Sequence, residues 1–76
     1  MPFDETQTEL LRELGERVRT LRLERSMTIK DLAHIAGKEI QSVHRLERGK
    51  INPSYLYMRS IAEGLGIDVA SLIEGL

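Results

Sequence analysis

The fold of this chain is decided by residues 28–48, TIKDLAHIAGKEIQSVHRLER. Apolar residues recur at helical spacing before Gly37, which interrupts the pattern, and Val43 and Leu46 resume it. Two helices this short need close mutual packing, so the small side chain of Ala33 suits the place where their backbones meet. Gly37 suits the turn because a left-handed backbone costs it nothing. The stretch therefore predicts two short helices joined by a tight turn.

A capping box at Asp4 and Gln7 predicts a first helix that runs to about Arg25. The inward face of this helix is predicted to consist of aliphatic side chains at helical spacing, namely Leu10, Leu14, Val18 and Leu21. Phe3 and Leu11 lie off this stripe. Two interpretations stay open for them, a solvated acidic helix end or packing against a partner subunit.

The two short helices have their own start and stop signals. Thr28 caps the second helix, with Asp31 placed to bond back, and this helix is expected to end near Ile35. The third helix is expected to run from about 39 to 48. Gly49 ends it, because helices commonly end on a left-handed glycine.

Two more helices are predicted towards the C-terminus. After a loop at Asn52 and Pro53, Ser54 caps a fourth helix that Gly66 ends. The apolar residues of this helix are Leu56, Ile61 and Leu65. Asp68 caps a fifth helix, whose apolar residues are Val69, Leu72, Ile73 and Leu76. Since no strand pattern occurs, the sequence predicts an all-α fold of five helices.

These features recur together in one known family. The matching residues are Leu21, Arg22, Arg25, Thr28, Leu32, Ala33, Gly37, Val43, Leu46, Glu47, Gly49, Lys50, Pro53, Ser54, Ile61, Ala62, Leu65, Gly66 and Leu72. At this spacing the chain resembles the lambda-repressor and Cro-like helix-turn-helix regulators of the XRE type, over roughly residues 14–76. The resemblance implies one five-helix, lambda-repressor-like DNA-binding domain over residues 1–76. Its helix-turn-helix motif would span 28–48, and the first helix would be extended by 4–13.

The third helix has one polar and one apolar side. At about 100° per residue, its polar side holds Lys38, Gln41, Ser42, Arg45 and Arg48. Glutamine can bond bidentately to adenine, arginine to guanine, and serine to base edges or phosphate. By their match to the family, Gln41, Ser42 and Arg45 are expected to read bases in the major groove. An ordinary solvated face is the alternative interpretation.

A second group is expected to contact the DNA backbone and to position the domain, namely Thr28, Lys30, Lys38, Arg48, Lys50 and Asn52. Ile29 departs from the family, where glutamine is common, which leaves the start of the second helix as the phosphate clamp. Lys38 also departs, and its stem is expected to cover the core while its ammonium reaches towards DNA. For Asn52, plain surface is an equal alternative.

Two side chains of the third helix border its apolar side. Glu47 needs a partner there, and the resemblance implies Arg22, in a partly buried ion pair that ties the recognition helix to the first helix. Two separately solvated charges are the alternative. For Ile40, packing in the core is favoured over contact with a thymine methyl group.

The net charge of −1 weighs against nucleic-acid binding, because phosphate contacts usually dominate affinity. The charges are unevenly spread, however. Residues 16–50 hold nine basic and five acidic side chains, whereas residues 1–15 hold one basic and four acidic ones. DNA responds mainly to nearby charge, so we expect modest affinity with strong salt sensitivity.

The sequence lacks the residues that several classes of function require. The sequence holds no cysteine, and His34 and His44 have no acidic cluster at ligand spacing, so neither a metal nor another cofactor is expected. Nothing resembles a nucleophile with its base, so the chain is not expected to be an enzyme. No apolar run could span a membrane, no small-molecule ligand is expected, and a cytoplasmic location fits.

The leading hypothesis is a sequence-specific regulator of transcription that binds double-stranded DNA. Because one recognition helix contacts few base pairs, we expect a homodimer on a pseudo-palindromic operator. The predicted dimerisation surface is Val69, Ile73 and Leu76 on the fifth helix, with packing inside the subunit as the alternative. A detached fragment of a larger regulator fits less well, because capping signals continue to the C-terminal end.

A second hypothesis is a protein-interaction module, such as an antitoxin or anti-repressor with the same fold. The acidic ends of the chain and its net charge favour this hypothesis. It makes a regulatory protein a further candidate partner, beside DNA and a second copy of the chain.

Overall fold

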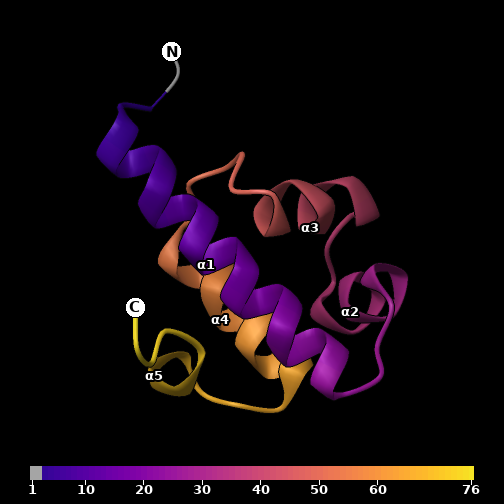
Figure 1. Cartoon of the computed structure of the whole chain (residues 1–76). Coiled ribbons are helices and arrows are strands. Elements are labelled where there is room, and N and C mark those ends of the chain that lie inside the picture. The colour runs from indigo at the N-terminus through magenta and orange to yellow at the C-terminus, as the bar shows by residue number, and fades with distance from the viewer. Residues whose placement is uncertain (1–2) are drawn as a thin grey trace.

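The computed structural model describes residues 3–76, which form five α-helices and no strand (Figure 1). The helices are α1 (Glu5–Glu24), α2 (Ile29–Ala36), α3 (Ile40–Glu47), α4 (Tyr55–Leu65) and α5 (Val69–Leu72). This confirms the predicted all-α fold of five helices.

Side-chain caps mark where four of these five helices begin, and α3 has none. The Asp4 carboxylate accepts a hydrogen bond from the Gln7 backbone N–H at 2.8 Å, and the Gln7 side chain accepts one in return from Asp4. Thr28 and Asp31 form the same reciprocal box at α2. The caps of the later helices are Ser54 at α4 and Asp68 at α5. Each cap satisfies a backbone N–H that the helix itself leaves unpaired.

The first four helices are each followed, at the C-cap or one residue beyond it, by a residue with a left-handed backbone, and after α3 this residue is Gly49, with φ 71°. Gly37 follows α2 with φ 68°, and Gly66 follows α4 with φ 77°. Ser26, in the turn after α1, has φ 54° although it carries a Cβ atom. This conformation is unfavourable for a residue with a Cβ, so the turn that precedes the motif is strained at Ser26.

The core lies between α1, α4 and the two short helices. Helix α1 packs against α3, α2 packs against both α3 and α4, and α5 packs against α4. Figure 1 shows α4 running beneath α1, with α2 and α3 to one side of this pair. The largest fully buried side chains are those of Val18, Leu32, Val43, Leu46, Ile61 and Leu72. The motif is therefore held by its apolar side, and its other side faces outward.

Helix α1 comes very close to the end of α3 at Gly15, in the middle of α1. A Cβ atom built there would lie 2.5 Å from the carbonyl oxygens of Leu46 and Glu47. A Cβ atom built on Gly49 would lie 2.8 Å from the Cα of Arg12, which is about one turn before Gly15 in α1. The end of α3 and the turn after it thus lie directly against the backbone of α1.

Leu10 and Leu56 are both exposed, and Leu10 belongs to the face of α1 that is predicted to point inward. Leu10 is 56% exposed, because α1 continues past the place where the chain crosses it at Gly49 (Figure 1). Leu56 is 73% exposed. It lies about 140° around α4 from Ile61, whose side chain is in the core.

The fifth helix is shorter than expected. It ends at Leu72, and Ile73 forms its C-cap, so Ile73 and Leu76 lie beyond the helix. The Arg17 guanidinium donates to the carbonyl oxygens of Ser71 and Leu72, at 2.8 and 3.1 Å. A side chain of α1 thus occupies the carbonyls at the end of α5.

No helix within residues 3–76 is long and apolar enough to cross a membrane.

Candidate nucleic-acid interface

The turn between α2 and α3 is closed by backbone hydrogen bonds. The Lys38 N–H donates to the Ala33 carbonyl at 2.8 Å, and the Gly37 N–H donates to the His34 carbonyl at 3.2 Å. Ala33 is 1% exposed, so the two short helices meet at this small side chain, as expected. The turn therefore fixes the direction in which α3 leaves α2.

Helix α3 has a buried side and an exposed side. Val43 is completely buried and Leu46 is 1% exposed, whereas Gln41 and Arg45 are both exposed. Gln41 and Arg45 are four residues apart, so their side chains project from the same side of the helix, one turn from each other. An amide and a guanidinium are therefore presented together.

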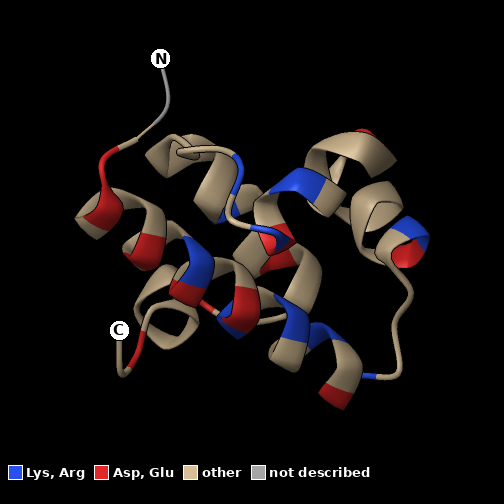
Figure 2. Cartoon of the chain, turned by 45° about the horizontal axis from the view of Figure 1, so that its top comes forward, with Lys and Arg blue, Asp and Glu red and all other residues tan. Residues whose placement is uncertain are grey.

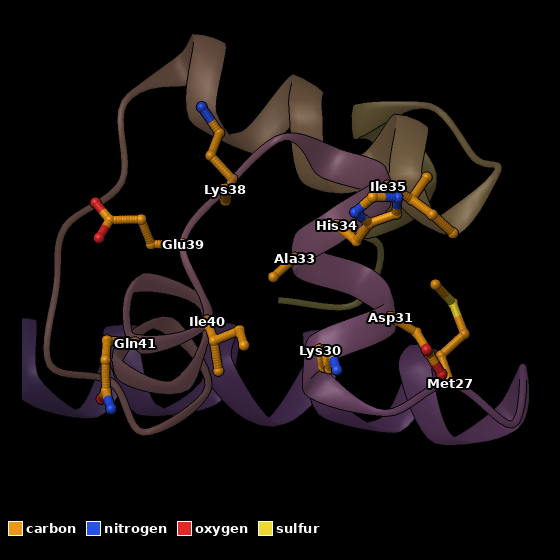
Figure 3. A pocket seen from close by; sticks show the side chains of 10 residues that line it. All are labelled: Met27, Lys30, Asp31, Ala33, His34, Ile35, Lys38, Glu39, Ile40 and Gln41. Carbon is orange, nitrogen blue, oxygen red and sulfur yellow. The ribbon is translucent and has the colours of Figure 1, made fainter.

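The serine between them is already engaged. The Ser42 hydroxyl is hydrogen-bonded to the Tyr57 hydroxyl of α4 at 2.6 Å, and Ser42 is half-buried. The Lys38 ammonium lies over the same tyrosine ring, 4.8 Å from its centroid. Lys38 is half-buried, and its charge lies against α4 (Figure 3).

A buried ion pair ties α3 to α1. The Arg22 Nε and Nη2 atoms donate to the two carboxylate oxygens of Glu47 at 2.6 and 2.9 Å. The Arg22 Nη1 atom donates to the Met27 carbonyl at 2.8 Å. Both side chains are less than a tenth exposed. The hydrogen bonds that Arg22 donates to the Glu47 carboxylate raise the pKa of Arg22, although burial alone would lower it.

The residues expected to position the domain lie on both sides of α3. Thr28 and Lys30 belong to the start of α2, and Lys50 and Asn52 belong to the loop after α3. All four are exposed, as is Arg48. Figure 1 shows α2 on one side of α3 and this loop on the other. A partner that contacts α3 from outside could therefore reach both groups.

An apolar groove lies between α2 and α3. Ile35 and Ile40 line it, 61% and 49% exposed, together with the half-buried Met27. Figure 3 shows Ile40 at the centre of this groove and Gln41 beside it, pointing away from α2. The expectation that Ile40 packs in the core is thus wrong. The first residue of α3 turns its side chain outward.

The C-terminal residues divide between the core and the surface. Leu72 is completely buried and Val69 is half-buried against the core, whereas Ile73 and Leu76 are 43% and 55% exposed. Of the residues expected to form a dimer surface, Val69 is thus partly used within the subunit. Ile73 and Leu76 remain available for another contact.

Sequence reasoning missed three residues of this region. Tyr57 gave no signal because its partners, Lys38 and Ser42, belong to another helix and to the turn before it. Arg17 gave none for a similar reason. A glycine inside a helix is unfavourable, so Gly15 could have been read as a place of close backbone contact.

Metal ligands are not gathered anywhere in residues 3–76, where no three His, Cys, Asp or Glu side chains could hold an ion together. His34 and His44 are both exposed, on α2 and α3.

Comparison with known proteins places these features in a family. Residues 13–73 match the family model described as "Helix-turn-helix domain". The HTH-type transcriptional regulator DdrOP3 of Deinococcus deserti is 43% identical over 63 residues, which cover 83% of this chain and 49% of that protein. The immunity repressor protein of Bacillus phage phi105 is 32% identical over 60 residues, covering 79% and 42%. This chain thus spans about half the length of the curated relatives it matches.

A solved structure resembles most of this chain. The crystal structure of the restriction-modification controller protein C.AhdI from Aeromonas hydrophila superposes with a TM-score of 0.81 at 30% identity. The match covers 83% of this chain and 96% of that one. The likeness thus extends over nearly the full length of the controller protein.

Proposed function

Because this chain belongs to the helix-turn-helix family of transcriptional regulators of the Cro/C1 (XRE) type, we propose that it binds double-stranded DNA in a sequence-specific way. Helix α3 enters the major groove, where Gln41 and Arg45 contact base edges and Ser42 contributes a hydroxyl group. Regulation of transcription follows from occupation of an operator. This activity places the protein in the cytoplasm, with the DNA.

One observation carries this proposal, the exposure of Gln41 and Arg45 on a helix whose other side is fixed. Val43 and Leu46 hold α3 in the core, and the ion pair from Glu47 holds its last turn to α1. An amide and a guanidinium on a rigid support can be aimed at adenine and guanine without reordering the helix.

Ile40 joins this base-reading set. Its side chain is half exposed at the first position of α3, next to Gln41. An apolar side chain that enters the major groove can contact the methyl group of thymine. We therefore assign Ile40 to such a contact.

The basic and polar residues on both sides of α3 would position the domain on phosphates. Thr28 and Lys30 contact one strand from α2, and Arg48, Lys50 and Asn52 contact the other from the loop. Asp31 and Glu39 lie beside this set. Several other acidic residues lie apart from it, and Figure 2 shows them following one another along the first half of α1. The net negative charge therefore need not oppose binding at α3.

We propose further that two copies bind one pseudo-palindromic operator, with recognition helices about 34 to 36 Å apart. Ile73 and Leu76 expose apolar surface just past α5, and Val69 lies half-buried beside them. This surface would join the two copies. One eight-residue recognition helix contacts too few base pairs to specify an operator alone, and a dimer doubles the number of base contacts.

The test is affinity selection from a random double-stranded DNA library at two salt concentrations. Enrichment of an inverted repeat, weakened steeply by salt, is the expected result. No enrichment even at low salt would overturn the proposal. The apolar groove at Ile35 and Ile40 would then favour a protein partner, of the antitoxin or anti-repressor kind, as the main ligand.

Single substitutions separate base reading from positioning. Arg45→Ala should cost about 1 to 3 kcal/mol and relax the preference at one position of each half-site. Lys50→Ala should weaken binding to all sequences alike and reduce the salt dependence. Arg19→Ala, an exposed change on α1, serves as the control. Equal losses on matched and mismatched duplexes for Arg45→Ala would contradict its assigned role.

A further inference from the structure

Tyr57 connects α4 to the start of the recognition helix. It lies in the first turn of α4, where its backbone N–H donates to the Ser54 cap at 3.1 Å. Its ring is half-buried and packs against the hydrophobic core. A tyrosine held at both its backbone and its ring has little freedom left, so its hydroxyl occupies a fixed place.

Both polar contacts of this side chain reach the start of α3. The hydroxyl lies 2.6 Å from the Ser42 Oγ atom, in the first turn of α3. The ring lies under the Lys38 ammonium, which belongs to the turn just before that helix. One side chain from outside the motif thus touches two of the motif's polar residues.

The hydroxyl pair leaves one hydrogen free. If Tyr57 donates to Ser42, the serine hydrogen is free to point outward. If Ser42 donates, the free hydrogen is that of Tyr57. In both arrangements the 2.6 Å contact restricts the rotation of the serine hydroxyl. The serine is left with a donor and a lone pair in the first arrangement and with lone pairs alone in the second, and these have defined directions. An unrestrained serine could donate or accept and would distinguish bases poorly.

Resting on the proposed DNA binding, we infer that Tyr57 is a positioning residue that sets base preference through Ser42. It aims the serine hydroxyl towards one base edge. It also keeps the charge of Lys38 beside α4, at the edge of the apolar groove between α2 and α3. Tyr57 itself need not touch a base for the operator preference to depend on it.

Removal of the single hydroxyl tests this inference. Tyr57→Phe keeps the ring, its packing and its contact with Lys38, and it frees Ser42. Tyr55→Phe is the matched control, since Tyr55 lies two residues earlier on the same helix and is 62% exposed. Binding is measured on the selected operator and on duplexes changed at each position.

Tyr57→Phe should weaken operator binding about five-fold, the size of one net hydrogen bond. The loss should be confined to discrimination at the base pair that Ser42 faces, and the salt dependence should stay unchanged. A merely structural role would instead weaken all duplexes equally. That result, or a Tyr57→Phe protein indistinguishable from Tyr55→Phe, would overturn the inference.

A double-mutant cycle shows whether the effect passes through the serine. In a Ser42→Ala background, Tyr57→Phe should leave discrimination at that base pair unchanged. A further loss there would also overturn the inference. The wild-type protein separates this test from the proposed function. If it binds no duplex, both fail together, and if it binds while the cycle is additive, only the role of Tyr57 fails.

Discussion

At the scale of single residues, the guanidinium of Arg22 connects α1 to two other segments of the chain. Its nitrogen atoms reach the Glu47 carboxylate of α3 and the Met27 carbonyl before α2. Both charges are removed from water, and neither could be left unpaired without a large penalty. The pair therefore makes the place of α3 depend on two other segments of the chain.

The first prediction concerns this pair. Glu47→Ala should lower the free energy of unfolding by about 3 to 5 kcal/mol, because it leaves the buried Arg22 without its carboxylate. Urea denaturation at neutral pH measures the effect. Glu24→Ala, at an exposed position of α1, is the control. A loss no larger than that of the control would show that the pair contributes little.

The contacts and exposure of these single residues could be predicted from the sequence only in part. The Arg22 and Glu47 pair came from a family resemblance, because nothing local links residues 25 positions apart. The exposed Gln41 and Arg45 followed from helical spacing alone. The contact of Tyr57 with Ser42 depends on how α4 packs against α3, which no pattern along the chain encodes.

At the scale of elements, local chemistry decides where four of the five helices begin. Asp4, Thr28, Ser54 and Asp68 were all identified as caps, and each accepts the expected backbone hydrogen bond. Capping involves residues three apart, so sequence carries the whole signal. The exposure of Leu10 could not be foreseen, since it depends on where another segment crosses α1.

The second prediction concerns the turn after α1. Ser26→Gly should stabilise the protein by about 1 kcal/mol, since glycine adopts the observed left-handed backbone without a Cβ clash. The gain is partly offset by the greater freedom of glycine in the unfolded chain. Ser60→Gly, inside α4, is the matched control and should destabilise by about the same amount. Thermal unfolding compares the two. A lower melting temperature for Ser26→Gly would contradict the prediction.

The third prediction concerns the capping box of α2. The hydrogen bond from the Thr28 backbone N–H, followed by that with its hydroxyl, lowers the pKa of Asp31. A carboxylate whose pKa is lower in the folded state stabilises that state above its unfolded pKa, and the contribution is lost as pH falls. Wild-type stability should therefore decline below about pH 4 as Asp31 is protonated.

Asp31→Asn should flatten that decline in acid. The control is Glu39→Gln, because the Glu39 side chain makes no capping hydrogen bond at α3. Chemical denaturation from pH 5 to pH 3 gives the comparison. Equal acid dependence in the wild type and in Asp31→Asn would exclude a contribution from this box.

At the scale of the whole molecule, exposed apolar groups remain at the C-terminal end after the core is complete. Leu72 fills the core, whereas Ile73 and Leu76 lie outside it. Sequence placed all of them on one amphipathic helix, because their spacing fits one. The helix instead ends at Leu72, and the Arg17 side chain occupies the last carbonyls. Arg17 lies far from these carbonyls in the sequence, so the end of α5 could not be predicted from local spacing.

The fourth prediction follows from this surface. Ile73→Lys should convert a dimer to a monomer, because it places a charge on exposed apolar surface without touching the core. Sedimentation analysis gives the mass, and operator binding should weaken in parallel. Leu23→Lys, on an exposed leucine of α1, is the control. If Ile73→Lys sediments like the wild type and the control, the dimer does not form through this surface.

The contact of α1 with α3 at Gly15 limits which sequences can adopt this fold. No side chain fits there, since even a Cβ atom would lie 2.5 Å from two backbone carbonyl oxygens. Gly37 has open space around it and is restricted only by its backbone angle. In a library randomised at both positions and selected for folded protein, we expect position 15 to return glycine alone. Position 37 should also accept asparagine. Substitutions on the exposed face of α3 can thus change which operator the protein prefers, whereas position 15, where α1 crosses α3, cannot be substituted.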